Sequence, residues 1–318
     1  MAPTSTWWSE MNPENGYIDL QVNGYAGLDF NRDDWNFDQL HEVCASLREH
    51  GVESIFATVI SAPIDRMVGR LKRIVSAREG DSLVRDVIAG VHLEGPFLNA
   101  GHGYIGAHRP EWTTEADQDS VGLLLDAGQG LVRLWTLSPE RDSAFAVTRQ
   151  LADQGVVVSA GHCDSSLDQL RGAIDAGLSL FTHLGNGCPA LLPRHDNIIQ
   201  RVLSLSDRLY ISFIADGVHV PYPALGNYMQ CVGMDRAIVI TDAISAAGLG
   251  PGRYTLGERA VVVGNDFAGR YPGEDDHLAG SAITMKQSEA NLKESLGLSE
   301  QDCRKVLSGN PRDLLGRG

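Results

Sequence analysis

Residues 156–162 read VVVSAGH, and this stretch decides the fold class. A run of β-branched residues that ends in small residues is typical of a buried strand. Residues 166–176 follow it with apolar side chains three and four positions apart, which predicts an amphipathic helix. A buried strand followed directly by a helix is the repeating unit of a parallel sheet with crossover helices.

The same alternation extends in both directions along the chain. Further strands are predicted at residues 17–22, 54–60, 86–92, 131–137, 179–182, 209–214 and 237–241. Further helices are predicted at residues 37–50, 64–77, 117–127, 143–154, 222–231 and 285–296, while the helix signal between residues 182 and 209 is weak. Eight strands of this kind predict a (β/α)8 TIM barrel. A doubly wound sheet needs a Gly-rich phosphate-binding turn, and the chain contains neither GxGxxG nor GxxxxGK[ST].

The composition narrows the class of protein. The chain has 318 residues, 43% of them hydrophobic, and a formal net charge of −15. These values exclude a disordered protein, and the acidic balance argues against nucleic acid as a partner. No apolar run approaches the roughly 20 residues that cross a bilayer, so we expect no membrane partner. The five cysteines are widely spaced without a CxxC motif, and the first residues lack a signal-peptide pattern, so we expect a cytoplasmic location.

Ionisable residues follow the predicted strands at the point where each strand ends. They are Glu94, His162, His183, Asp216, His219 and Asp242. The carboxyl ends of barrel strands converge on one mouth, where barrel enzymes build their active sites. Two imidazoles and a carboxylate are a suitable set of ligands for Zn²⁺ or a similar divalent ion, with one position open for water. Asp242 is then placed to take the proton of that water.

Each of these residues also has a purely structural interpretation. A histidine at a strand end is more often a hydrogen-bonded structural residue than a metal ligand. Glu94, before Gly95 and Pro96, can cap a turn, and Asp242 can cap a helix. Spacing alone does not separate these interpretations, although the convergence of three candidates favours the metal site.

Seven segments occur along the chain in a recognisable order. They read YIDLQVNG at 17–24, HLEGP at 92–96, SAGH at 159–162, THL at 182–184, ADGVH at 215–219, TDA at 241–243 and LAGS at 278–281. Together they resemble the N-acetylglucosamine-6-phosphate deacetylase family of the amidohydrolase superfamily, and the resemblance covers essentially the whole chain. It implies metal-dependent conversion of N-acetylglucosamine 6-phosphate, an amino sugar phosphate, to glucosamine 6-phosphate and acetate.

The resemblance also implies a role for each matching residue. Glu94, His162 and His183 would hold one divalent metal ion per chain, with Zn²⁺ first and Fe²⁺, Co²⁺ or Mn²⁺ as alternatives. Asp242 would act as general base and then as general acid, and His108 would polarise the amide carbonyl. The residues that would contact the substrate are Ala107, His108, Asn186, Gly187, Arg194, His219, Leu278, Ala279 and Gly280. Among these, Arg194 and His219 would bind the phosphate.

Two further expectations concern the metal count and the assembly. Many members of the superfamily carry His-x-His on the first strand for a second metal, whereas this chain has Gln21 and Asn23 there. Amides are poor ligands for such an ion, so we expect a single-metal site. In this family a phosphate-binding residue can come from a neighbouring subunit, so we expect a homodimer.

The chain departs from the family pattern at its ends. Family members usually carry flanking strands that form a small β-sandwich, whereas this chain reaches its first predicted strand at Tyr17 and stops at Gly318. We therefore expect an N-terminal extension at residues 1–16 and a hydrolase barrel at residues 17–318, with little or no accessory β-sandwich. Trp7 and Trp8 are candidates to cover the barrel surface that this loss exposes.

Two alternative functions remain open at this point. The small side chains of residues 185–188 leave room for a different substrate, such as a non-phosphorylated acetamido sugar or an N-acyl amino acid. A barrel that only binds an amino sugar phosphate, without catalysis, is an alternative from another class. The complete set of Glu94, His162, His183 and Asp242 counts against it, because a binding protein has no need to generate hydroxide.

Overall fold

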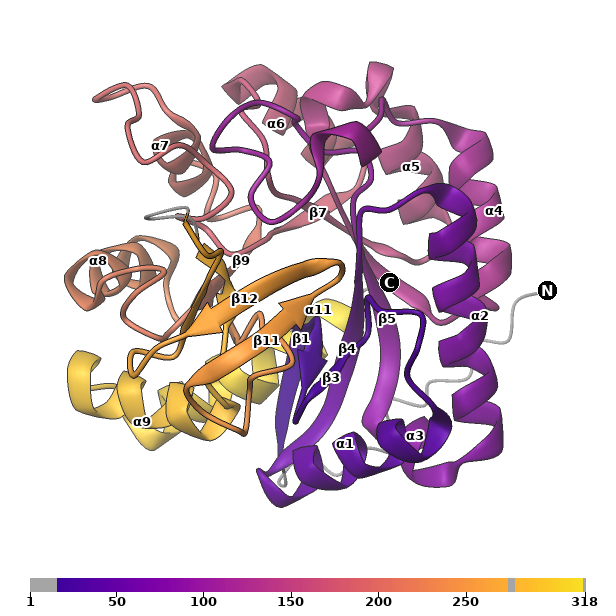
Figure 1. Ribbon diagram of the computed structural model, residues 1–318. Coiled ribbons are helices and arrows are strands. Elements are labelled where there is room, and N and C mark those ends of the chain that lie inside the picture. Colours follow the sequence, from indigo (N-terminus) through magenta and orange to yellow (C-terminus); the bar gives the residue numbers. More distant parts are fainter. Residues whose placement is uncertain (1–15, 274–277, 317–318) are drawn as a thin grey trace.

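The computed structural model describes residues 16–273 and 278–316 (Figure 1). The eight predicted strands form one parallel sheet in which each strand pairs with the next along the chain. They are β1 (Tyr17–Val22), β4 (Val52–Ile60), β5 (Ile88–Glu94), β6 (Val132–Leu137), β7 (Val157–Ala160), β8 (Leu178–Phe181), β9 (Tyr210–Ile214) and β10 (Ala237–Ile240). The predicted (β/α)8 barrel is confirmed, with strand boundaries within two residues of those predicted.

The barrel closes between β10 and β1 without a regular ladder. An isolated parallel bridge joins Val22 to Ala243, just beyond the end of β10. The backbone N–H groups of Asn23 and Gly24 donate to the carbonyl oxygen of Ala243 at 2.7 and 3.2 Å. This seam therefore lacks the regular ladder that joins the other neighbouring strands, and Asp242 lies at this seam.

Most of the helices cover the outside of the sheet, as the amphipathic pattern predicts, while the last one closes an end of the barrel. They are α1 (Phe37–Glu49), α2 (Ile64–Gly80), α3 (Ser82–Val87), α4 (Gln118–Gly128), α5 (Ala146–Asp153), α6 (Leu167–Asp175), α7 (Ile198–Leu203), α8 (Tyr222–Val232), α9 (Met285–Leu296), α10 (Glu300–Arg304) and α11 (Asn310–Leu315). Short 3-10 turns lie at Pro110–Trp112, Pro139–Arg141 and Ser143–Phe145, and a π-turn at Lys305–Gly309. None of the described helices has the length and apolar character needed to cross a membrane.

Three local features differ from the sequence prediction. The start of the predicted strand at residues 86–92 is helical instead, because the side chain of Asp81 caps α3 by accepting hydrogen bonds from Leu83 and Val84. The predicted helix at residues 143–154 is interrupted, since Ala144 and Phe145 have φ of 53° and 55°. Where the helix signal was weak, α7 has six residues.

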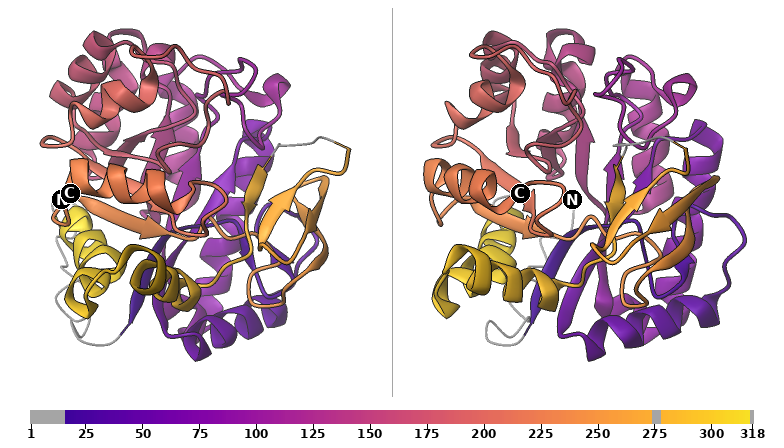
Figure 2. Two further views of the ribbon diagram at one scale, coloured as in Figure 1. Left: turned by 90° about the vertical axis from the view of Figure 1, so that its left-hand side faces the viewer. Right: turned by 60° about the vertical axis from the view of Figure 1, so that its left-hand side comes forward.

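A four-stranded antiparallel sheet follows the barrel, and the sequence analysis did not predict it. Its strands are β11 (Gly252–Leu256), β12 (Arg259–Val263), β13 (Ala268–Arg270) and β14 (Leu278–Ser281). A two-stranded sheet of β2 (Gly24–Tyr25) and β3 (Leu28–Asp29) precedes it in the chain. Figure 2 shows the antiparallel sheet at the end of the barrel toward which the strand arrows point. The antiparallel sheet therefore lies beside the mouth of the barrel, where the predicted site residues are located.

The opposite end of the barrel is filled by apolar side chains. Leu314 and Leu315 of α11 pack with Ile18, Leu20 and Phe56 in one buried cluster inside the barrel. This plug leaves the mouth at the carboxyl ends of the strands as the place for polar chemistry. The predicted extension at residues 1–16, with Trp7 and Trp8, lies outside the described residues apart from Gly16.

Candidate active site

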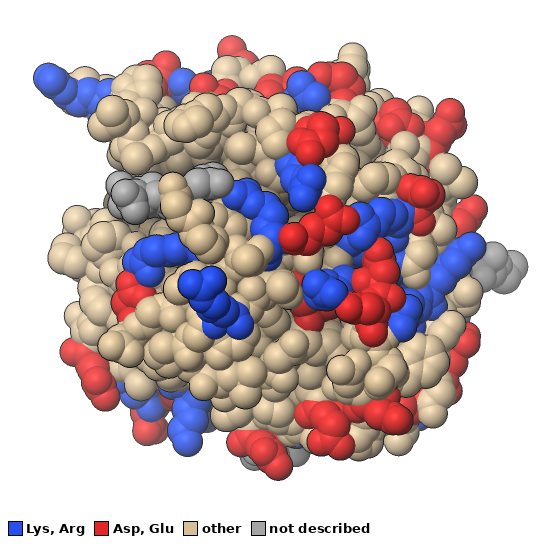
Figure 3. Space-filling model, viewed as in Figure 1, with Lys and Arg blue, Asp and Glu red and all other residues tan. Residues whose placement is uncertain are grey.

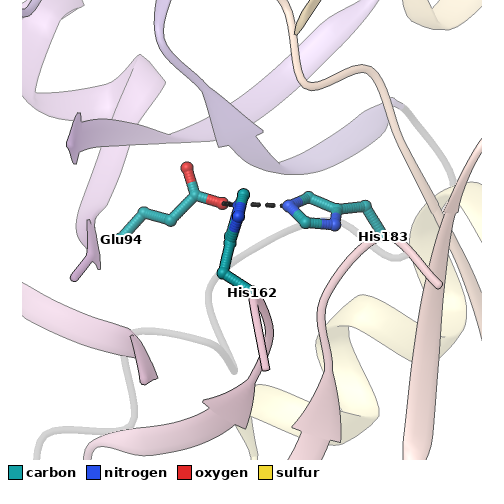
Figure 4. A group of neighbouring side chains, drawn as sticks. All are labelled: Glu94, His162 and His183. Atoms are coloured by element: carbon teal, nitrogen blue, oxygen red, sulfur yellow. Dashed lines mark hydrogen bonds and ion pairs between the residues drawn. The ribbon is translucent and has the colours of Figure 1, made fainter. Parts of the chain in front are cut away.

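Three predicted metal ligands meet at the mouth of the barrel. Glu94 ends β5, and His162 and His183 follow β7 and β8. The Nε2 atoms of His162 and His183 lie 3.2 and 3.0 Å from Oε1 of Glu94, and Figure 4 shows the three side chains pointing toward one another. One possible ligand atom from each residue lies within 4.8 Å of the others. Residues 94, 162 and 183 are thus brought together by the fold, as predicted.

The contacts of His162 suit a divalent cation. Its Nδ1–H donates to the carbonyl oxygen of Tyr104 at 2.7 Å, so in the neutral ring Nε2 carries a lone pair. That lone pair faces the carboxylate of Glu94, which is also an acceptor. A cation bound between the two satisfies both, and a backbone carbonyl on the other ring nitrogen is the usual support for a metal-bound histidine. The donor set therefore fits the implied ion.

The ionisation of Glu94 depends on its two histidine neighbours. Burial by itself would raise the pKa of Glu94, but hydrogen bonds from His162 and His183 hold that pKa well below its usual range. Burial likewise lowers the pKa of His162, yet Glu94 produces a net rise. The site thus favours a charged carboxylate with positive partners, the arrangement that a bound cation completes.

Backbone geometry at the strand ends directs these side chains. His162, His183 and Asp242 have φ of 52°, 36° and 49°, the left-handed region that residues other than glycine rarely adopt. Such strained positions persist only where surrounding contacts hold them, and they cluster at functional sites. Each of the three comes two residues after the last residue of a barrel strand.

Asp242 faces the cluster from the end of β10. Its Oδ1 accepts hydrogen bonds from Gln21 Nε2 at 3.0 Å and from Asn23 Nδ2 at 2.8 Å. Gln21 Nε2 also donates to Oε1 of Glu94 at 3.0 Å, so one amide links the proposed base to a metal ligand. Burial and the charge of Glu94 raise the pKa of Asp242 to about 6. Gln21 and Asn23 thus act as hydrogen-bond donors to the carboxylate of Asp242.

His108 lies on the other side of Glu94. Its Nε2 is 3.7 Å from Oε2 of Glu94, and its ring centroid is 4.7 Å from that of His162. The backbone N–H of Ser61 donates to its Nδ1 at 3.4 Å, which assigns the remaining proton to Nε2. Burial lowers the pKa of His108 to about 3, so the ring is neutral at physiological pH.

His219 is held as an ion pair with Asp216. Nδ1 of His219 lies 2.5 Å from Oδ2 of Asp216, and both side chains are buried. Burial opposes the charge on His219, but the Asp216 carboxylate raises its pKa above the ordinary value. Nε2 of His219 has no hydrogen-bond partner among the described residues. When protonated, this imidazole presents an N–H that is suited to a phosphate oxygen.

Among the residues predicted to contact the substrate, Asn186, Gly187 and Gly280 lie close to the site, whereas Arg194 is exposed on a loop. A Cβ on Gly187 would lie 2.9 Å from Nδ1 of His162, and one on Gly280 would lie 2.8 Å from the carbonyl oxygen of Asp242, so both backbones pass close to the site. Asn186 donates to the carbonyl oxygen of His183 at 3.3 Å. Arg194 is exposed and makes no hydrogen bond or ion pair with a described residue.

The remaining predicted contacts, Ala107, Leu278 and Ala279, lie on segments that border the site. The carbonyl oxygen of Ala107 accepts from the hydroxyl of Tyr271, which ties the loop before His108 to the antiparallel sheet. Leu278 and Ala279 belong to β14, whose Ser281 bridges to Ala243. Sequence reasoning missed the link of Gln21 to Glu94 and Asp242, for which the only signal was a pair of amides on the first strand.

Comparison with known proteins gives a consistent picture, although no family model matches the chain. An N-acetylgalactosamine-6-phosphate deacetylase of Escherichia coli O157:H7 is 32% identical over 94% of this chain and 77% of its own length. An N-acetylglucosamine-6-phosphate deacetylase of Danio rerio is 31% identical over 95% of this chain and 74% of its own length. A solved Mycobacterium smegmatis N-acetyl-D-glucosamine-6-phosphate deacetylase, a variant in complex with N-acetyl-D-glucosamine-6-phosphate, has a TM-score of 0.83 and 33% identity over 95% of this chain and 77% of that one.

Proposed function

The chain belongs to the N-acetylglucosamine-6-phosphate deacetylase family of the amidohydrolase superfamily, and we propose that it hydrolyses N-acetylglucosamine 6-phosphate to glucosamine 6-phosphate and acetate. One observation carries the proposal. A buried acid–histidine–histidine cluster, formed by Glu94, His162 and His183, lies beside Asp242 at the mouth of the barrel. A binding protein has no use for this combination, whereas amide hydrolysis needs both a polarising centre and a base.

One divalent cation per chain would be held by Glu94, His162 and His183, with Zn²⁺ as the first candidate. When bound there, it polarises water and the substrate carbonyl, so that hydroxide is available near neutral pH. Gln21 and Asn23 already donate to Asp242 and Glu94, which supports a site for a single ion.

Asp242 moves the proton. Its two amide partners both bond to Oδ1, and none of the described residues donates to Oδ2, so this oxygen can accept a proton from the attacking water. The same oxygen then gives that proton to the nitrogen of the departing amine. A pKa raised to about 6 suits a group that must both accept and donate a proton near neutral pH.

His108 acts on the carbonyl oxygen. The Ser61 N–H holds the ring with its proton on Nε2, the atom that faces Glu94 and the cluster. A neutral N–H donor fixed before the reaction begins stabilises the negative charge that grows on the carbonyl oxygen. Its place beside His162 puts this donor next to the proposed cation site.

Recognition of the phosphate needs local positive charge, because the net charge of −15 opposes the approach of an anion. His219, paired with Asp216, supplies one cation inside the site. Figure 3 shows basic side chains gathered over the middle of the face that carries β11 and β12, with acidic ones among them. Arg194 would add a bidentate contact to the phosphate.

The exposed position of Arg194 supports a homodimer in which this residue serves the neighbouring subunit. Its loop also carries Leu191, which is 92% exposed. All five cysteines are unpaired, which supports the proposed cytoplasmic location.

An acetate-release assay on metal-replete protein tests the function. We expect turnover of N-acetylglucosamine 6-phosphate and little turnover of plain N-acetylglucosamine. Because an E. coli relative is named for the galactosamine substrate, N-acetylgalactosamine 6-phosphate is the third substrate to be assayed. The Asp242→Asn variant should keep its metal and lose about 10²- to 10⁴-fold in kcat. Full activity of that variant with metal bound, or no turnover of any acetamido sugar by the wild type, would refute the proposal.

A further inference from the structure

A buried carboxylate outside the proposed chemistry lies under the catalytic base. Asp19 of β1 is 2% exposed, and two of its hydrogen-bond donors belong to Thr241. Its Oδ2 lies 2.5 Å from Oγ1 of Thr241, and its Oδ1 lies 3.2 Å from the backbone nitrogen of Thr241. The N–H of Gln21 is a third donor, at 3.3 Å. Thr241 immediately precedes Asp242 in the chain.

Thr241 carries this contact into the turn at Asp242. Its Oγ1, after donating to Asp19, accepts the N–H of Ala243 at 3.1 Å. The chain of hydrogen bonds crosses the seam between β10 and β1, where the strands share no regular ladder. The side chain of Asp19 therefore supplies hydrogen bonds between β1 and the end of β10, where a regular ladder is absent, next to Asp242.

A second contact holds the same turn from the opposite side. The hydroxyl of Ser281, in β14, donates to the carbonyl oxygen of Thr241 at 2.5 Å, and the Ser281 N–H donates to that of Asp242 at 3.0 Å. Between these supports Asp242 has φ of 49°. For a residue other than glycine this conformation costs of the order of 1–3 kcal/mol, so contacts with neighbouring residues are needed to hold the turn.

We propose that Asp19 is a positioning residue that holds Asp242 in its left-handed conformation through Thr241; this role rests on the proposed function, in which Asp242 is the base. Without Asp19, residue 242 relaxes and its carboxylate leaves the amides of Gln21 and Asn23. The metal ligands come from the other strands β5, β7 and β8, so they keep their places. The expected signature is a loss of kcat with KM and metal content unchanged.

Asp19→Asn tests this with almost no change in shape. One carboxylate oxygen becomes an NH₂ group, which faces the donors of Thr241 instead of accepting from them. We expect kcat to fall about 10- to 100-fold, the usual effect of losing such a supporting contact. Thr241→Val, which removes the hydroxyl, should show the same loss, and Thr241→Ser should restore activity to within about twofold of wild type.

Asp142 offers a matched control. It is 4% exposed and accepts from the N–H groups of Val147 and Thr148 and from the hydroxyl of Thr148, a set of donors like that of Asp19. Asp142→Asn should lower Tm as Asp19→Asn does and leave kcat within about twofold. An equal kcat for the two variants, or a loss in Asp19→Asn that is accompanied by loss of metal, would overturn the proposal.

A structural readout separates this inference from the proposed function. In crystals of metal-loaded Asp19→Asn, the carboxylate of residue 242 should lie beyond hydrogen-bond distance of Nδ2 of Asn23. If it still lies within that distance, Asp19 does not position it. If the wild type releases no acetate from any substrate, the proposed function fails, while the crystal structure of the variant still decides the role of Asp19.

Discussion

The backbone N–H of Ser61 donates a hydrogen bond to Nδ1 of His108 over 3.4 Å. This contact fixes the tautomer of a buried ring that would otherwise be free to carry its proton on either nitrogen. The proton resides on Nε2, 3.7 Å from Oε2 of Glu94. His108 is thereby prepared as a neutral hydrogen-bond donor at the site.

His108→Ala should lower kcat about 10²- to 10³-fold, because it removes a fixed donor to the charge that develops on the carbonyl oxygen. His108→Gln should retain more activity, since its amide N–H can reach the position of Nε2. Steady-state kinetics with metal content measured in parallel checks both. Equal activity of the alanine variant and the wild type would show that the carbonyl oxygen has another partner.

Metal removal should destabilise the protein. Without the ion, the buried Glu94 carboxylate has only its histidine neighbours to balance its charge. We expect Tm to fall after dialysis against a chelator and to recover when Zn²⁺ is added, because a ligand that binds only the folded state stabilises it. Glu94→Gln should show little recovery, whereas Asp142→Asn should recover as the wild type does. Recovery in the Glu94 variant would place the ion elsewhere.

Arg194→Met should raise KM for N-acetylglucosamine 6-phosphate roughly 10- to 100-fold and leave turnover of plain N-acetylglucosamine unchanged. A hydrogen bond to a charged group contributes about 1.5–3 kcal/mol, which gives this range. Arg171→Met, at another exposed arginine, is the control. Mixing Arg194→Met with an Asp242→Asn chain should restore activity if the arginine serves the neighbouring subunit. A uniform KM in all variants would remove Arg194 from the phosphate site.

Phosphate binding should weaken as pH rises through the pKa of His219, because the imidazole loses its charge. Burial lowers the pKa of this ring and the Asp216 carboxylate raises it above its ordinary value overall. Asp216→Asn removes the strongest of the charges that raise the pKa of His219, so the rise in KM should move to lower pH. The second ionisation of the substrate phosphate is common to both proteins, so the difference between their KM profiles reports His219. Superimposable profiles would contradict this role.

Stability should fall as pH rises through the window set by Asp29. Burial raises the pKa of this carboxyl from 3.8 to about 7, so the folded state binds more protons than the unfolded state between these two values. The free energy of unfolding therefore decreases with pH across that window. Asp29→Asn, which cannot ionise, should show a shallower decrease between pH 5 and pH 8 in urea titrations. The same slope in both proteins would mean that Asp29 is charged throughout.

Local patterns were sufficient to predict the barrel. Each strand and most helices have a periodicity that depends only on neighbours in the chain, and α9 begins and ends where the sequence predicts. The antiparallel sheet was missed because its strands are short and three of them contain a glycine, such as Gly252 and Gly269. The kink at Ala144 and Phe145 was missed because their φ values follow from tertiary packing, not from their residue types.

Strand and turn signals are local, so they were enough to predict which residues stand at the carboxyl ends of the strands, and hence that Glu94, His162, His183 and Asp242 could converge. How these side chains are held depends on contacts between distant segments. The link of Gln21 to Glu94 and Asp242, and the support of Asp242 by Asp19 through Thr241, join residues more than 70 positions apart. Such hydrogen bonds form only when the barrel closes, which brings β1 beside β10 and Gln21 within reach of Glu94, and no local sequence pattern indicates these contacts.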